Sequence, residues 1–113
     1  LGDMVSFHEP GAFVHEHTDP VVEGERVVRV NVLVQHPEAG GMPVLEGKEL
    51  AIAPGQGWFF RPYKVPHSST VVEGSTPRIN ISMGWSVTVA ARSGRLHISR
   101  MPCFSRMARY CFM

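Results

Sequence analysis

Residues 26–35 read Arg-Val-Val-Arg-Val-Asn-Val-Leu-Val-Gln, which is the clearest strand pattern in this chain of 113 residues. Side chains two residues apart share a face of a β-strand. One face would therefore carry four valines, namely Val28, Val30, Val32 and Val34. The other face would carry Val27, Arg29, Asn31, Leu33 and Gln35. The pattern predicts a strand with one apolar face and one face that is largely polar.

Shorter strand patterns surround this stretch, and glycine and proline residues separate them. We expect further strands over residues 4–8, 12–16, 42–45, 49–52, 58–60, 68–73 and 78–85. No stretch has the period of a helix. About eight short strands separated by turn residues predict an all-β sandwich or small barrel.

The charge distribution changes near residue 87. Residues 1–87 contain all ten acidic side chains and six basic ones, whereas residues 88–113 contain five arginines and no acid. We therefore expect a core domain over 1–87 and a basic C-terminal extension over 88–113, whose structure the pattern does not define. This extension lacks a basic platform with interleaved aromatic residues, so we expect no nucleic-acid partner.

Both cysteines, Cys103 and Cys111, lie in the basic extension, so neither a disulfide framework nor a cysteine zinc site organises the core. This usage favours a reducing compartment, and we expect a cytoplasmic protein. Hydrophobic residues make up 43% of the chain and charged residues 19%, which excludes a disordered or fibrous class. No apolar run has the length of a membrane span, so no membrane partner is expected.

A candidate metal site combines the stretch His15-Glu16-His17-Thr18-Asp19-Pro20 with the later His67. In a strand, His17 and Asp19 would project from one face and Thr18 from the other. Two imidazoles and one carboxylate on one side of an ion leave its other coordination positions free for oxygen chemistry. The pattern therefore indicates a centre for one divalent metal ion.

Three further features follow this pair along the chain. Gly40-Gly41 comes first, then Pro-Gly-Gln-Gly-Trp-Phe-Phe at 54–60 leading to His67, and then Arg78 eleven residues later. In this order and spacing, residues 4–86 resemble the catalytic core of the Fe(II)- and 2-oxoglutarate-dependent oxygenases, specifically the prolyl-4-hydroxylase-like branch. The resemblance implies an all-β double-stranded β-helix, or jelly roll, in which the N-terminal helices that usually brace the larger sheet are missing.

The resemblance also implies a chemistry. His17, Asp19 and His67 would bind Fe(II), and Arg78 would pair with the distal carboxylate of 2-oxoglutarate. No catalytic residue is expected beyond the metal centre. The expected reaction is hydroxylation of a C–H bond of a small-molecule or peptidyl substrate by molecular oxygen, with release of succinate and CO₂.

Further contacts to the oxoacid follow from strand alternation. Asn80 and Ser82 share a face with Arg78, and Asn31 and Leu33 should line the pocket from the opposite strand. Many relatives have a tyrosine near the position of Leu33, and others have a serine where this chain has Asn80. The second oxoacid contact is therefore left open among these residues.

Two alternatives compete with the oxygenase. His15 shares a strand face with His17 and Asp19, and a His-x-His pair with a glutamate, Glu23 or Glu25, would suit a cupin metal site. The cupin alternative assigns no role to Arg78. A catalytically inactive metal-binding jelly roll is the other alternative. The remaining histidines, His8, His36 and His97, are expected to be surface groups or satisfied core groups.

Overall fold

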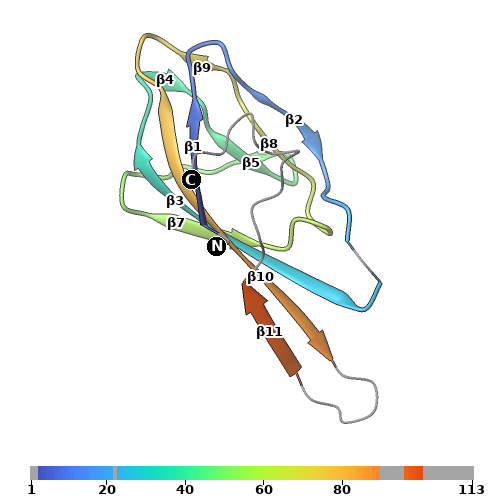
Figure 1. The fold of residues 1–113 in the computed structure, drawn as a ribbon. Helices are drawn as coiled ribbons and strands as arrows, with labels where there is room; N and C mark the ends of the chain where they lie inside the picture. Colours follow the sequence, from blue (N-terminus) through green and yellow to red (C-terminus); the bar gives the residue numbers. More distant parts are fainter. Residues whose placement is uncertain (1–2, 22, 90–95, 101–113) are drawn as a thin grey trace.

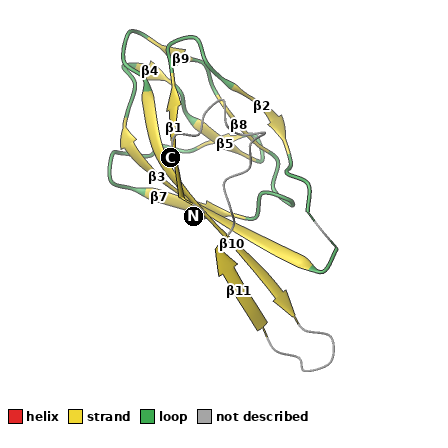
Figure 2. Ribbon diagram, in the orientation of Figure 1, coloured by secondary structure: helices red, strands yellow, loops and turns green. Residues whose placement is uncertain are grey.

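The computed structural model describes residues 3–21, 23–89 and 96–100, and every regular element in these ranges is a β-strand (Figures 1 and 2). The strands are β1 (Asp3–His8), β2 (Val14–His17), β3 (Glu25–Gln35), β4 (Ala39–Gly40), β5 (Pro43–Leu45), β6 (Lys48–Glu49), β7 (Gly57–Phe60), β8 (His67–Ser69), β9 (Val72–Glu73), β10 (Arg78–Val89) and β11 (Leu96–Arg100).

Two antiparallel sheets contain most of these strands. The larger sheet has the order β1-β10-β3-β7, with β11 also paired to β10, and the smaller sheet has the order β2-β8-β5-β6. Along the chain, β1, β3, β7 and β10 join the larger sheet, while β2, β5, β6 and β8 join the smaller one. The chain thus passes back and forth between two sheets, as in a jelly roll. The predicted all-β class and jelly-roll core are confirmed.

The stretch predicted as one strand at 68–73 is divided in the structure. β8 belongs to the smaller sheet, whereas β9 pairs with β4 in a separate two-stranded ribbon. Between them, the Thr70 amide donates to the carbonyl of Met42 at 3.0 Å, and the Thr70 hydroxyl accepts from the Met42 amide at 2.9 Å. These contacts redirect the chain from one pairing partner to another, so the prediction of a single strand is wrong.

The larger sheet continues past the change in charge near residue 87. β10 extends to Val89, and β11 pairs with its end from Trp85 opposite Arg100 to Val89 opposite Leu96. In Figure 1 this hairpin reaches beyond the rest of the two sheets. The division of the chain at residue 87 remains a prediction, although one strand crosses it. Cys103 and Cys111 lie outside the described residues.

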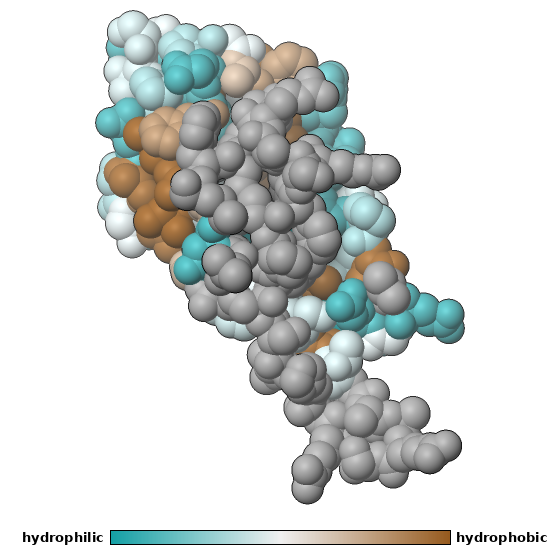
Figure 3. All heavy atoms as spheres, in the orientation of Figure 1, coloured by the Kyte–Doolittle hydropathy of each residue, from teal (hydrophilic) through white to brown (hydrophobic). Residues whose placement is uncertain are grey.

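The two faces of β3 have different surroundings. Val27 and Leu33, on the predicted polar face, are buried with exposed fractions of 5% and 3%, and Arg29 and Asn31 on that face border the cavity between the sheets. The valine face instead forms the outer surface of the larger sheet, where Val34 is 48% exposed. Figure 3 shows apolar side chains gathered at one edge of the molecule, over the region where Figure 1 draws β3. The polar face is therefore the inner one, and it positions the site.

Candidate metal centre and cavity

Strand pairing brings the two candidate histidine ligands together. His17 ends β2 and His67 begins β8, and the two residues are direct partners across these antiparallel strands. Asp19 lies two residues beyond the end of β2, where its amide donates to the carbonyl of Pro62 at 2.8 Å. Asp19 is therefore held by a loop contact and not by a strand. The structure nevertheless brings all three predicted ligands together.

The ligand atoms converge on one point. Oδ1 of Asp19 lies 3.2 Å from Nε2 of His17 and 3.3 Å from Nε2 of His67. The Nδ1 atoms face backbone carbonyls, of His15 at 2.7 Å and of Val65 at 2.9 Å. When Nδ1–H donates to its carbonyl, Nε2 is free to bind a metal ion beside Oδ1 of Asp19, whereas an Nε2–H would donate to Oδ1 when no ion is bound. This cluster can hold a metal ion.

The carboxylate of Asp19 is ionised at neutral pH. Burial by itself raises the pKa of Asp19, but the hydrogen bond with His67 and the positive charge of Arg29 outweigh burial and lower the pKa below its usual value. Nη2 of Arg29 lies 3.4 Å from Oδ2 of Asp19. The sequence placed Arg29 on the polar face of its strand but did not identify it as a site residue.

A cavity of about 260 Å³ between the sheets connects the metal cluster to the other predicted site residues. His17 and His67 line it together with Arg78, Asn31, Asn80 and Ser82. All four residues predicted to contact 2-oxoglutarate thus border one cavity, although their role is not tested by this placement. Leu33 is buried but does not border the cavity.

Arg78 is a buried cation at the start of β10. It is 4% exposed, and burial lowers its pKa to about 10, so it stays charged at neutral pH. Nη1 donates to the carbonyl of Gly41 at 2.6 Å, and Nη2 lies 3.1 Å from Nδ1 of His8. Among the described residues, Nε has no hydrogen-bond partner and no carboxylate forms an ion pair with Arg78. A buried cation without an acid nearby is the arrangement that an anionic ligand would stabilise.

His8 is part of this polar end of the cavity, which the sequence did not reveal. It is 5% exposed and lies directly opposite Arg78 in the pairing of β1 with β10. Burial, and then the charge of Arg78, lower the pKa of His8 to about 4. His8 is therefore neutral at physiological pH and can accept a hydrogen bond from the guanidinium. Only the long-range register of β1 on β10 brings the two residues together.

The Gly40-Gly41 pair supports Arg78 through its backbone. Both residues have positive φ, +64° and +61°, and a Cβ atom at Gly40 would lie 1.9 Å from the carbonyl oxygen of Val71. The Gly41 amide donates to that same carbonyl at 2.9 Å. Because only glycine combines this close approach with a left-handed backbone, the pair fixes the carbonyl that receives the Arg78 hydrogen bond.

The residues of the alternative cupin site do not join the cluster. His15 is exposed and packs its ring edge against Phe13, with centroids 4.7 Å apart. Glu25 accepts a hydrogen bond from the Ser86 hydroxyl at 2.8 Å, and Glu23 is exposed. In the part of the chain that the structure describes, the metal-binding group consists of His17, Asp19 and His67.

Comparisons with known proteins leave the family open. No family model matches the chain, and no curated protein matches it. Among solved structures, the chain is similar to KdgF from Halomonas sp., with a TM-score of 0.44 and 19% identity over 72% of this chain and 77% of that one. This distant similarity does not support the prolyl-4-hydroxylase-like branch in particular. Within the described ranges, no helix is long and apolar enough to cross a membrane. The chain is a jelly roll with a candidate metal centre in its cavity, and its chemistry has to be argued from the residues of that cavity.

Proposed function

We propose that this chain is the core of an Fe(II)- and 2-oxoglutarate-dependent oxygenase that hydroxylates a C–H bond of a small-molecule or peptidyl substrate. The observation that carries the proposal is the pairing, in one cavity, of a His-Asp-His cluster with a buried arginine that has no acid partner among the described residues. A metal ion accounts for the first feature, and a carboxylate ligand accounts for the second.

The donor set suits ferrous iron. Two imidazoles and one carboxylate occupy one side of an ion and leave positions for a chelating oxoacid and for oxygen. When bound, the iron and 2-oxoglutarate supply the activation of molecular oxygen, with succinate and CO₂ as the products of the oxoacid. His17, Asp19 and His67 would hold the ion, and the residues that border the cavity would position the oxoacid.

The opposite end of the cavity suits the distal carboxylate of the oxoacid. Arg78 would donate to this carboxylate from its guanidinium, whose Nε atom has no partner among the described groups. The side chains of Asn80 and Ser82 are buried on the same face of β10, and their amide nitrogen and hydroxyl are groups that can donate to a carboxylate. We assign the second oxoacid contact to these two residues and to Asn31, which borders the cavity from β3.

A titration of 2-oxoglutarate into the anaerobic Fe(II) protein tests this proposal. Chelation through the 1-carboxylate and the 2-keto oxygen is expected to produce a metal-to-ligand charge-transfer absorbance that saturates with the oxoacid. The Zn²⁺-loaded protein is the control, because Zn²⁺ has a filled d shell and no redox chemistry. If folded, iron-loaded protein gives no such absorbance, the oxygenase is excluded and a metal-binding module without turnover remains.

A further inference from the structure

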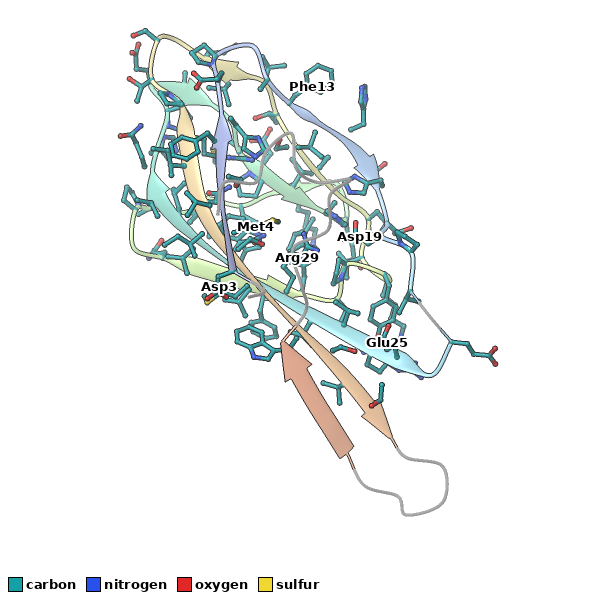
Figure 4. All side chains as sticks on the ribbon, viewed as in Figure 1. Asp3, Met4, Phe13, Asp19, Glu25 and Arg29 are labelled. Atoms are coloured by element: carbon teal, nitrogen blue, oxygen red, sulfur yellow. The ribbon has the colours of Figure 1, made fainter. Side chains whose placement is uncertain are left out.

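Arg29 enters the cavity beside the metal cluster, although the proposed chemistry gives it no task. It lies on the inner face of β3, its side chain is 13% exposed, and it borders the same cavity as His17 and His67. Gly84, which has no side chain, is its direct partner on β10. Figure 4 shows Arg29 and Asp19 close together in the space between the sheets.

The two oxygens of Asp19 have different partners. Oδ1 faces both Nε2 atoms, at 3.2 Å and 3.3 Å, whereas Oδ2 faces Nη2 of Arg29 at 3.4 Å. We infer that Arg29 is a positioning residue, which holds Oδ2 so that Asp19 binds the metal ion through Oδ1 alone. The inference rests on the metal-binding part of the proposed function and is independent of 2-oxoglutarate.

The number of open positions on the ion depends on this contact. Asp19 lies two residues beyond the end of β2, and its backbone contact to Pro62 does not fix the rotation of its carboxylate. A carboxylate free to rotate can bind a metal through both oxygens and thereby occupy one more coordination position. A guanidinium that engages the second oxygen prevents this, as groups around metal ligands commonly fix ligand orientation. Arg29 thus keeps a position available for exogenous ligands.

Titration of Co²⁺ into the apoprotein, without oxoacid, tests this role through the visible d–d spectrum and the binding affinity. In Arg29→Gln, we expect the spectrum to change and the Co²⁺ affinity to fall by about 10–100-fold, the usual loss when a partner of a metal ligand is removed. Arg29→Lys keeps a positive charge and a hydrogen-bond donor, so its Co²⁺ affinity should lie between those of the wild type and Arg29→Gln. Arg26→Gln is the matched control, because Arg26 is exposed on the same strand.

A double-mutant cycle separates positioning from a general effect on the fold. In an Asp19→Ala background, measured at millimolar Co²⁺, Arg29→Gln should cause no further loss, because its partner is already gone. The inference is overturned if Arg29→Gln has the wild-type spectrum and affinity, or if it weakens binding equally without Asp19. A rise in affinity would also overturn it, since Arg29 would then act only by repelling the ion. Should Arg29→Gln fail to fold, the Arg29→Lys spectrum decides, with an unchanged spectrum and affinity counting against the role.

This outcome and that of the proposed function can be told apart. A protein whose Co²⁺ spectrum depends on Arg29 but whose iron form gives no charge-transfer band with 2-oxoglutarate supports the positioning role and rejects the oxygenase. A charge-transfer band that forms normally in Arg29→Gln, together with an unchanged Co²⁺ spectrum, supports the oxygenase and rejects the positioning role. Wild-type protein that binds no Co²⁺ overturns the inference directly.

Discussion

Nη2 of Arg78 lies 3.1 Å from Nδ1 of His8, and the two residues are direct partners on β10 and β1. A buried guanidinium is thus held by a neutral imidazole and by the carbonyl of Gly41, with no carboxylate of the described residues in contact. This arrangement keeps the positive charge of Arg78 available to a ligand. It also links the stability of the protein to the protonation of His8.

Acid should destabilise the fold through His8. Its pKa is about 4 in the folded protein, against 6.5 in the absence of burial and of Arg78. Between these values the unfolded chain binds more protons, so the free energy of unfolding falls as the pH is lowered from 6.5 to 4, by on the order of 3 kcal/mol. Urea unfolding at several pH values should show this slope in the wild type and a shallower one in His8→Gln. Equal slopes would contradict the contribution of His8.

Substitution of the ligand His17 should weaken metal binding, whereas substitution of its neighbour His15 should not. Replacement of His17 by alanine removes one of three ligands, and we expect metal affinity to fall by more than about 100-fold, beyond the usual effect of outer-sphere changes. His15→Ala should bind metal as the wild type does, because His15 contributes its carbonyl and not its side chain. Calorimetric titration of the apoprotein measures both. Similar metal affinities in the two variants would show that His17 is not a metal ligand.

Substitution of Arg78 should affect the oxoacid and leave the metal ion bound. Loss of one partner of a buried charged pair costs about 3–5 kcal/mol, so Arg78→Ala should weaken 2-oxoglutarate binding by roughly two to three orders of magnitude. The charge-transfer titration gives this affinity, and Arg61→Ala, at an exposed position, is the control. If Arg78→Ala and the wild type bind the oxoacid equally well, the oxygenase proposal stands, but a residue other than Arg78 contacts the distal carboxylate.

Much of the fold follows from local patterns in the sequence. The alternation in residues 26–35 assigns Arg29 and Asn31 to one face and four of the five valines to the other, which is the observed division. It does not say which face is inside. Valines usually point to a core, but here the inner face borders the cavity that holds Arg29 and Asn31, and the valine face is the outer surface of the larger sheet.

The contacts that organise the site are less predictable, because they depend on register between distant strands. His8 contacts Arg78 only because β1 pairs with β10, and Arg29 of β3 contacts Asp19 from a loop whose backbone is held by the carbonyl of Pro62. No local sequence pattern predicts either contact. The ligand triad was predictable for a different reason, since its residue types and order carry a chemical meaning without any knowledge of register.

Gly41 should tolerate a side chain less well than Gly55, which has a similar backbone. Both have positive φ, so alanine at either position costs about 1–2 kcal/mol for the left-handed conformation. A Cβ atom at Gly41 also lies 3.0 Å from side-chain carbons of Pro37 and Val72, whereas nothing lies within 4 Å at Gly55. Gly41→Ala should therefore be the less stable variant in urea unfolding. It should also weaken 2-oxoglutarate binding, because its carbonyl holds Arg78; Gly55→Ala should not.

Removal of residues 88–113 should leave metal binding intact. The three ligands lie between residues 17 and 67, and the cavity-bordering residues of β10 end at Ser82. β11 pairs only with residues 85–89 of β10, beyond that part of the strand. A chain truncated after Val87 should therefore bind Co²⁺ with wild-type affinity once circular dichroism has shown that it is folded. If the folded truncated chain binds as weakly as His17→Ala, the basic extension belongs to the domain that forms the metal centre, and the boundary inferred from charge is misplaced.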